Sequence, residues 1–562
     1  MSLQFITGNS GNGKTKYLFN RIVKEAKANP RDNYLVIVPE QFTMQTQRQL
    51  VDLSENKAIM NIDVLSFKRL AYRVFDELGI TNLTVLEETG KNLVLRKLAA
   101  QEADKLGVIG RNLNRIGYIS EVKSLLSELV QYNISPEELG RYIASGRLSD
   151  TLSDKLKDVL VLYEAFEKFM QDKYITAEEI LNVLSNVAEE SAILRNSVIA
   201  FDEFTGFTPI QNQLIKKLFV ISKKIYVTLT IDCREDIFKS RGMQELFDMP
   251  KRTVKSLTEM AAFYGIEVEE PIILDKNYRL AENEELSFME QQLFRKRRCS
   301  FKKEPKHIHI DCLRDPKQEL TKIARRINEL VRNENLRYRD IAIVTGDVNI
   351  YAGYVREIFD KYNIPYFIDA TQEILFHPFI EFIRSIPDIA AQNFSADAVF
   401  RFLRCGFSEL LDSEIDVLEN YVLACGVRGK SAWDKKWVRL PKHKAGYDLE
   451  LLNQSREYIM ELLKPVYQVF SDKKSTVKDY VLAIYKLIVL LDIPDKLAKK
   501  EQALLDAGDQ TASKEYGQIY KIVMQLFEKY VAVLGDECMD AEEFTQILDA
   551  GLDAANISLD TT

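Results

Sequence analysis

Residues 8 to 15 form a glycine-rich stretch that constrains the start of the fold more than any other feature of the sequence. The stretch matches the pattern G-x-x-x-x-G-K-[ST] in full, with Gly8, Asn9, Ser10, Gly11, Asn12, Gly13, Lys14 and Thr15. An apolar run at residues 3–6 precedes it, and apolar residues at helical spacing follow it. This order of strand, loop and helix predicts a phosphate-binding loop, because backbone N–H groups and the helix N-terminus attract phosphate oxygens.

The loop predicts a site for ATP and Mg²⁺. Lys14 would reach the β- and γ-phosphates, and the Thr15 hydroxyl would hold the Mg²⁺ ion. The alternative is a glycine-rich turn that binds nothing. We prefer the phosphate loop because the motif lies within the first predicted strand, loop and helix, which is the context that phosphate binding requires.

The composition indicates a cytoplasmic protein of several domains. A length of 562 residues predicts three or four domains. No apolar stretch approaches the roughly 18 residues of a membrane span, and no charged leader precedes an apolar signal core, so we expect neither a membrane anchor nor secretion. The six cysteines form no C-x-x-C pair and there are only four histidines, which argues against a zinc or iron–sulfur site in this chain.

The net charge of −8 argues against a surface that is basic throughout, although it allows a local basic groove. The densest basic run is at residues 295–298. One interpretation of this run is a solvated linker, and the other is an edge that contacts phosphates. His307 and His309 alternate along a predicted strand, and we expect both to be structural.

The order of apolar patterns predicts an α/β protein with two α/β domains, each interrupted by helices. We expect the first α/β domain at residues 1–83 and 191–290, with a helical insertion at 84–190. The second α/β domain is expected at 291–375. A helical insertion of that second domain, which we expect to be truncated, fills residues 376–562.

Continuous apolar runs predict buried parallel strands. The predicted strands of the first domain are 3–6, 34–38, 62–65, 197–201 and 224–230, and those of the second are 307–310, 340–344 and 364–368. Helices are predicted at 319–331 and 355–362, and helical apolar stripes occur at 119–130 and 156–170. Parallel strands with right-handed crossovers would bring Gly13, Asp202 and Arg279 near one cleft.

A second nucleotide signal is the acidic pair Asp202 and Glu203, which directly follows the apolar strand at 197–201. A carboxylate at the C-terminal end of a parallel strand lies opposite the phosphate loop, where it holds Mg²⁺. We assign Asp202 to the metal and Glu203 to the orientation of an attacking water. An acidic turn after a strand is common, so the pair predicts a nucleotide site only in combination with the phosphate loop upstream.

A third signal is the segment Asn277–Arg279. In superfamily 1 helicases a similar N-Y-R follows the first motor domain, and its arginine reaches the γ-phosphate, which makes Arg279 a candidate for this contact. The alternative is a surface arginine after a strand. The candidate catalytic residues are therefore Lys14, Asp202, Glu203 and Arg279.

Polar and aromatic residues follow three predicted strands, on the side of the sheet that carries the phosphate loop. Aromatic rings stack on single-stranded bases, while arginine and amide side chains contact base edges or phosphates. For Phe67 and Tyr72 the alternative is a place in the core. The predicted DNA-binding residues are Gln41, Thr43, Phe67, Arg69, Tyr72 and Phe207.

Several segments resemble a known family. They are the phosphate loop, V-P-E-Q-F-T, V-L-S-F-K-R-L-A-Y-R-V, D-E-F-T-G-F-T-P, Y-R-D-I-A-I-V, I-P-Y-F-I-D, H-P-F-I-E-F-I-R-S and L-E-N-Y-V-L-A-C-G-V-R-G. In this order they resemble AddB, the B subunit of the bacterial AddAB ATP-dependent helicase/deoxyribonuclease, and they run from residue 3 to about residue 433. The chain resembles the N-terminal portion of that family.

The resemblance implies two superfamily 1 helicase-like P-loop NTPase domains with parallel sheets. It implies a heterodimer with an AddA-type helicase–nuclease subunit that acts on single- and double-stranded DNA. The expected role is the processing of double-strand breaks for recombinational repair, with recognition of the Chi sequence in the single strand. Because the chain is shorter than the family and has no nuclease motif or four-cysteine set, the nuclease and its iron–sulfur cluster are implied only for the full-length protein.

Two other functions remain as alternatives. An autonomous superfamily 1 ATP-dependent DNA helicase would need the motifs of a second motor domain, which we do not find in this sequence. A P-loop ATPase that does not bind DNA, such as a small-molecule kinase, is disfavoured by the helical insertion between Thr15 and Asp202 and by the second α/β unit.

Overall fold

The protein is described by a computed structural model in which two compact units are distinguished. The structure describes residues 1–81, 85–107, 118–146, 148–171, 174–295, 299–368, 372–374, 376–441, 447–472, 474–553 and 556–557. The first unit comprises Met1–Leu86, Leu125–Ala144 and Phe169–Asp311, and the second comprises Glu87–Ser124, Ser145–Lys168 and Cys312–Thr562. Within the described ranges, no helix is both long and apolar enough to span a bilayer.

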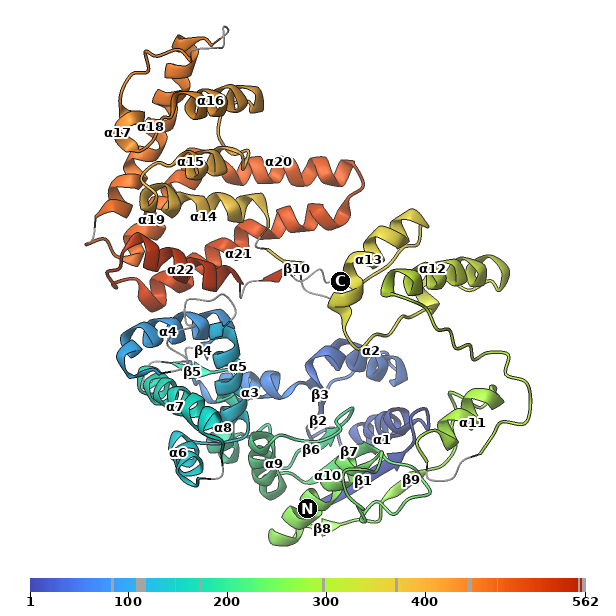
Figure 1. Ribbon diagram of the computed structural model, residues 1–562. Coiled ribbons are helices and arrows are strands. Elements are labelled where there is room, and N and C mark those ends of the chain that lie inside the picture. Colours follow the sequence, from blue (N-terminus) through green and yellow to red (C-terminus); the bar gives the residue numbers. More distant parts are fainter. Residues whose placement is uncertain are drawn as a thin grey trace. The chain divides into compact units, whose positions relative to one another are not determined.

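A parallel sheet forms the centre of the first unit (Figure 1). Its strand order is β3-β2-β6-β7-β1-β8, and β9 also pairs with β1. The strands are β1 Ser2–Gly8, β2 Tyr34–Ile37, β3 Ile62–Leu65, β6 Val198–Phe201, β7 Lys224–Thr230, β8 Glu267–Val268 and β9 Ile272–Leu274. All pairings in this sheet are parallel. The five strands predicted for the first domain are confirmed, and β3 and β7 have the predicted bounds.

Helices cover both faces of this sheet. Those of the first unit are α1 Lys14–Ala28, α2 Thr43–Leu53, α3 Phe67–Leu78, α6 Pro136–Ala144, α8 Ile180–Val187, α9 Pro209–Ile221, α10 Asp248–Phe263 and α11 Glu284–Gln292. Short 3-10 turns lie at η1 Glu40–Phe42 and η4 Ala188–Glu190, and a separate strand pair joins β4 Val85–Leu86 to β5 Ile175–Thr176. Helices α5 Tyr118–Gln131 and α7 Asp150–Met170 each have residues in both units.

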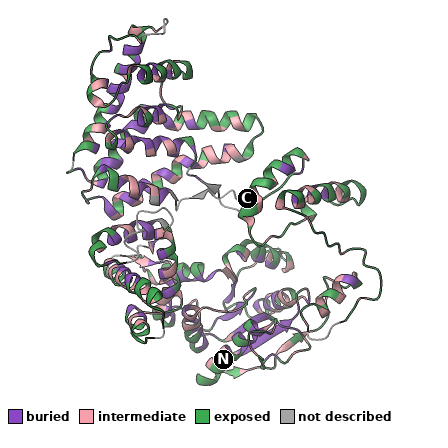
Figure 2. Ribbon diagram, in the orientation of Figure 1, coloured by how far each residue is buried: buried purple, intermediate pink, exposed green. Residues whose placement is uncertain are grey.

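Side chains that alternate along the strands fill two cores, one on each face of the sheet. In β2, Leu35 and Ile37 pack into the core that α3, α8, α9 and α10 cover. Tyr34 and Val36 pack into the other core, which α1 and α2 cover. Figure 2 shows the central strands as buried. Burial on both faces explains why these strands appear in the sequence as continuous apolar runs.

Capping side chains determine where the chain turns into helix after β3 and after β6. The Ser66 hydroxyl accepts the Arg69 N–H at 3.3 Å and so begins α3. Before α9, the Thr208 hydroxyl accepts the Gln211 N–H at 3.4 Å, and the Gln211 side chain accepts the Thr208 N–H at 2.9 Å. This capping box satisfies two N–H groups that would otherwise lack partners.

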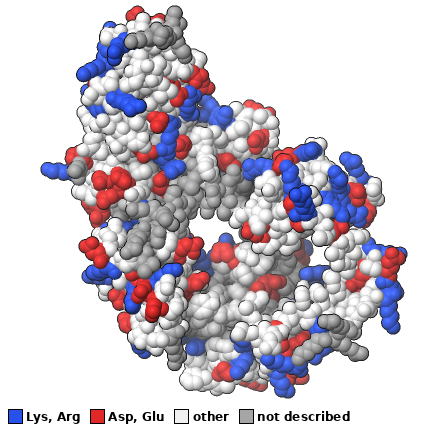
Figure 3. Space-filling model, viewed as in Figure 1, with Lys and Arg blue, Asp and Glu red and all other residues white. Residues whose placement is uncertain are grey.

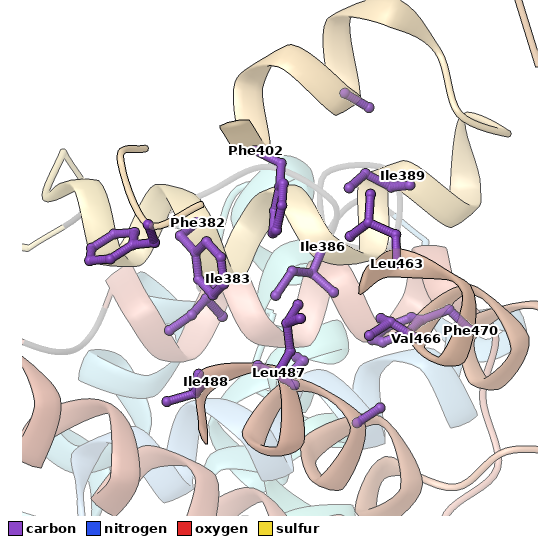
Figure 4. Packing of buried hydrophobic residues seen from close by; sticks show 14 of the residues in the cluster. Phe382, Ile383, Ile386, Ile389, Phe402, Leu463, Val466, Phe470, Leu487 and Ile488 are labelled. Carbon is purple, nitrogen blue, oxygen red and sulfur yellow. The ribbon is translucent and has the colours of Figure 1, made fainter. Parts of the chain in front are cut away.

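The second unit is helical. Its helices are α4 Glu88–Gln101, α12 Pro316–Asn333, α13 Val348–Lys361, α14 Pro378–Ala391, α15 Ala396–Leu403, α16 Asp412–Cys425, α17 Lys430–Asp434, α18 Leu449–Ser471, α19 Val477–Leu490, α20 Ile493–Asp506, α21 Gln510–Leu534 and α22 Ala541–Asp553. Its 3-10 turns are η2 Ala103–Lys105 and η5 Tyr338–Asp340, and β10 Gln372–Glu373 pairs with β11 Asn556–Ile557. In the core, Phe382 of α14 lies 5.0 Å from Phe402 of α15, and Leu463 of α18 and Leu487 of α19 belong to the same cluster (Figure 4).

Among the described residues, the second parallel sheet expected from the sequence is not formed. The described segments 307–310, 340–344 and 364–368 contain no strand, although α12 and α13 lie where helices were predicted. Ile310 and Val344 are each 94% exposed, and Phe367 is 57% exposed. Strand formation needs a hydrogen-bonded neighbour, and none of the three segments pairs with one among the described residues. The predicted α/β class is confirmed, with one parallel sheet and mostly helices among the described residues. The expectation of two P-loop NTPase domains is not confirmed.

Candidate functional site

The phosphate loop lies between β1 and α1, as the motif predicted. β1 ends at Gly8 and α1 begins at Lys14. Gly11 and Gly13 have φ angles of 87° and 80°, a left-handed conformation that is strained for other residues. Gly13 is the N-cap of α1, and no side chain caps this helix. The first N–H groups of α1 are thus not taken by a capping side chain, and such groups bind anions.

Residues Asn277–Arg279 pack against the carbonyl oxygens of the loop. Asn277 Nδ2 donates to Ser10 O at 3.0 Å, and the Tyr278 N–H donates to Gly11 O at 3.0 Å. Arg279 Nη1 lies 3.4 Å from Ser10 Oγ. These contacts use carbonyl and hydroxyl oxygens, so they hold the loop without occupying the N–H groups that phosphate oxygens need.

The Lys14 ammonium group is turned into the loop. Its Nζ donates to Gly8 O at 3.1 Å and to Asn9 O at 3.0 Å. Burial lowers the pKa of Lys14, and the carboxylates of Glu203 and Asp202 act in the opposite direction. A cation held by two backbone carbonyls is ready to exchange them for phosphate oxygens, which bind it more strongly because they are charged.

Asp202 and Glu203 follow β6 at the edge of the sheet where the phosphate loop lies. Asp202 is 1% exposed, and its Oδ1 accepts a hydrogen bond from the Thr228 hydroxyl of β7. Burial raises the pKa of Asp202, and the hydroxyls of Thr228 and Thr15 oppose that rise. Glu203 has a φ of 64°, and its Oε1 accepts the Thr15 hydroxyl at 3.2 Å.

The oxygens at this point suit Mg²⁺. Asp202 Oδ2 is buried and has no hydrogen-bond partner among the described residues. An unsatisfied buried carboxylate oxygen is costly unless something else binds it, and the Thr15 hydroxyl lies beside this carboxyl. Nowhere in the described part of the chain do three His, Cys, Asp or Glu side chains form a metal-binding group. Mg²⁺ binds through one or two protein oxygens together with phosphates and water.

A cavity of about 810 Å³ joins these groups. Its lining includes the candidate catalytic residues Lys14, Asp202, Glu203 and Arg279 together with Thr15. Tyr278, which the sequence analysis named only as part of the Asn277–Arg279 segment, lines the same cavity, and so do the α2 side chains Gln45 and Gln49, which it did not name. The available signal for the two glutamines was the position of α2, which follows β2 through the short turn η1.

Three of the predicted DNA-binding side chains are accessible. Gln41 is exposed in η1, and Tyr72 is 39% exposed on α3. Arg69 Nε lies 3.4 Å from Glu40 Oε1, and half of the Arg69 side chain is exposed. These residues follow β2 and β3, which are neighbours in the sheet.

The other three predicted DNA-binding residues are already engaged within the first unit. Thr43 is 3% exposed, and its hydroxyl donates to Glu40 O at 2.9 Å. Phe67 is 8% exposed, and its ring centroid lies 6.4 Å from that of Phe207. Both rings belong to an aromatic cluster with Phe201 and Phe204. In this conformation the Phe67 ring packs in the core, which was its alternative interpretation. Contact with DNA stays a prediction for all six residues.

Charge is mixed over the molecular face seen in Figure 3, where acidic and basic side chains are interspersed. Of the basic run at 295–298, only Arg295 lies within the described residues. Its guanidinium donates to Asp232 Oδ2 at 2.7 Å and lies over the Phe247 ring. Arg295 is thus bound inside the first unit, whereas residues 296–298 lie outside the description.

Comparison with known proteins identifies one family. The family model described as "ADDB, N-terminal" matches residues 5–290, and it therefore includes the phosphate loop, the acidic pair and the 277–279 segment.

Curated relatives match the whole chain. A protein of Lachnoclostridium phytofermentans is 38% identical over 569 residues, which cover 100% of this chain and 49% of that protein. A protein of Clostridium acetobutylicum is 32% identical and covers 98% of this chain and 48% of its own length. A third, from Caldanaerobacter subterraneus, is 32% identical with 99% and 49% covered. All three are named as the B subunit of an ATP-dependent helicase/deoxyribonuclease, and the chain spans about half the length of these relatives.

Proposed function

Because the chain belongs to the ADDB N-terminal family, we propose that it is the ATP- and DNA-binding part of the B subunit of a cytoplasmic helicase–nuclease. In this proposal the protein pairs with an AddA-type subunit and processes double-strand breaks for recombinational repair. The observation that carries the nucleotide part is that one cavity is lined by Lys14, Thr15, Asp202 and Arg279. These side chains supply the cations and the metal ligands that a nucleoside triphosphate needs.

The residues have distinct roles toward ATP–Mg²⁺. Lys14 leaves its two carbonyl partners and binds the β- and γ-phosphates, while the N–H groups of the loop bind the remaining oxygens. Thr15 and Asp202 would hold Mg²⁺, which neutralises phosphate charge when it is bound. Arg279 approaches from Ser10 toward the γ-phosphate, and Glu203, released from Thr15, orients water.

The DNA part of the proposal places single-stranded DNA at the edge of β2 and β3. The exposed Tyr72 ring offers a stacking face, worth roughly 1–3 kcal/mol per base. Arg69 would exchange Glu40 for a guanine edge or a phosphate, and Gln41 would contact an adenine edge. We propose that these contacts recognise the Chi sequence in the single strand. Double-stranded DNA would enter the complex before it is separated into single strands.

Nucleotide binding is tested by titrating the full chain with a fluorescent ATP analogue in the presence of Mg²⁺. Lys14→Ala should weaken binding roughly ten- to a hundredfold, because a charged hydrogen-bond donor to phosphate contributes about 1.5–3 kcal/mol. Lys24→Ala is the matched control, since Lys24 is an exposed lysine on the same helix. Unchanged affinity in Lys14→Ala would show that the nucleotide does not bind at this loop.

A further inference from the structure

The segment from β9 to α11, residues 272–292, contacts most residues of the first half of the phosphate loop. A Cβ on Gly8 would lie 2.6 Å from Leu274 O, so only glycine allows β9 to approach there. Asn12 Nδ2 donates to that same Leu274 O at 2.6 Å. Residues 277–279 contact Ser10 and Gly11. Asn9, which lies between Gly8 and Ser10, is contacted by α11.

Both ends of the Asn9 amide are used. Asn9 is 6% exposed, and its Nδ2 donates to Glu290 Oε1 of α11 at 2.7 Å. Its Oδ1 accepts the Cys233 N–H, just after β7, at 3.2 Å. A buried amide with both ends bonded has one orientation, and a charged acceptor such as Glu290 makes the bond stronger than a neutral one would.

The Asn9 backbone carbonyl is one of the two groups that hold the Lys14 ammonium group. Asn9 therefore lies between a cation on its carbonyl and the Glu290 carboxylate on its side chain. The two bonds act on one residue, so the bond to Glu290 helps to fix the position of the backbone carbonyl that holds Lys14. When Lys14 moves from Asn9 O to a phosphate, Asn9 loses one of the contacts that fix it, and a shift of Asn9 would displace its bond to Glu290.

The opposite end of α11 holds the chain where it leaves the first unit. Glu285 is 9% exposed, and its carboxylate accepts the N–H groups of Lys306 at 2.7 Å and His307 at 2.9 Å. One short helix thus connects the phosphate loop, through Glu290, with residues 306 and 307, through Glu285.

We propose that Glu290 is a positioning residue, which orients Asn9 for phosphate binding and transmits nucleotide occupancy through α11 to residues 306 and 307. This inference rests on the proposed function, because it requires that the loop bind ATP. Glu290 itself acts through Asn9 and does not touch the nucleotide.

The test combines ATP titration with amide hydrogen exchange of Lys306 and His307 in the full chain, with and without ATP–Mg²⁺. In the wild type, ATP–Mg²⁺ should change the exchange of these amides. Glu290→Ala should lower ATP affinity about tenfold and abolish the exchange response. Glu290→Gln keeps an acceptor for Asn9 and should restore both. Glu284→Gln, at an exposed position of α11 whose partner is Lys303, is the control and should leave both unchanged.

The arms of this experiment separate the two claims. A wild-type chain that binds no ATP would overturn the proposed function. A wild type that binds ATP, together with a Glu290→Ala variant that keeps its affinity and its exchange response, would overturn the role of Glu290 alone. If Glu290→Ala does not fold, Glu290→Met removes the acceptor while filling the space, and the same two readouts apply to it.

Discussion

The phosphate loop is predicted to tolerate no side chain at Gly11. An alanine there would adopt a φ of 87°, which costs about 1–2 kcal/mol. Its Cβ would also lie 2.8 Å from both Arg279 Cβ and Asn277 Oδ1. The 277–279 segment must therefore move, with loss of its hydrogen bonds to Ser10 O and Gly11 O, at about 0.5–1.5 kcal/mol each. Gly11→Ala should thus destabilise the first unit by about 2–5 kcal/mol and weaken ATP binding.

Gly79→Ala separates the cost of backbone strain from the cost of the steric contact with residues 277–279. Gly79 has a similar φ of 69°, but nothing lies within 4 Å of a Cβ at that position, so its cost is the backbone strain alone. Both tryptophans, Trp433 and Trp437, belong to the second unit. Urea unfolding followed by tryptophan fluorescence therefore reports the second unit, and far-ultraviolet circular dichroism reports both. Gly11→Ala should shift only the dichroism transition, and by more than Gly79→Ala. Equal shifts in the two variants would refute the packing argument.

Three further outcomes are expected. Burial lowers the pKa of His377 to about 4, so the unfolded chain takes up a proton before the folded chain does. As the pH is lowered from about 6.5 to about 4, the free energy of unfolding should therefore fall by about 1.4 kcal/mol per pH unit. His377→Asn, which keeps a capping side chain, should flatten this slope in tryptophan-monitored unfolding. Glu203→Gly should stabilise the first unit by roughly 1 kcal/mol in dichroism-monitored unfolding, because glycine adopts the φ of 64° without strain. An unchanged free energy of unfolding would contradict the claim that the Glu203 backbone is strained. In fluorescence anisotropy with a labelled single-stranded oligonucleotide, Arg69→Ala should weaken binding and Glu40→Gln, which frees Arg69, should strengthen it; changes of the same sign would exclude the proposed exchange of partners.

The first sheet was predictable because its strands are buried on both faces. Residues such as Val36 and Ile199 are fully buried, and such strands appear as apolar runs that periodicity detects. β8 and β9 were not predicted, because they are short and because Ile273 of β9 is 47% exposed, so they form no continuous buried apolar run. The segments around Ile310, Val344 and Phe367 have the same apolar character as real strands, but a strand also needs a partner, and local sequence does not supply one.

The candidate site was predictable where a motif fixes the chemistry at short range. Lys14 and Thr15 follow from the loop pattern, and Asp202 follows from its place after a buried strand. The contact between Asn9 and Glu290 joins residues 281 positions apart, and no local pattern predicts such a pair. Phe67 was ambiguous for a different reason: an aromatic residue at a helix start serves equally for stacking and for packing, and burial decides between them.

The most direct test of the central claim is the Mg²⁺ dependence of ATP affinity in the wild type and in Asp202→Asn, measured by isothermal titration calorimetry. Among the buried side-chain oxygens of the described residues that lack a hydrogen-bond partner, Asp202 Oδ2 is the one that belongs to a carboxylate, so it should be a ligand of the metal. The wild type should bind ATP more tightly with Mg²⁺ than with a chelator, and Asp202→Asn should lose that difference while still binding ATP without metal. An Asp202→Asn variant with the full Mg²⁺ dependence of the wild type would contradict the account.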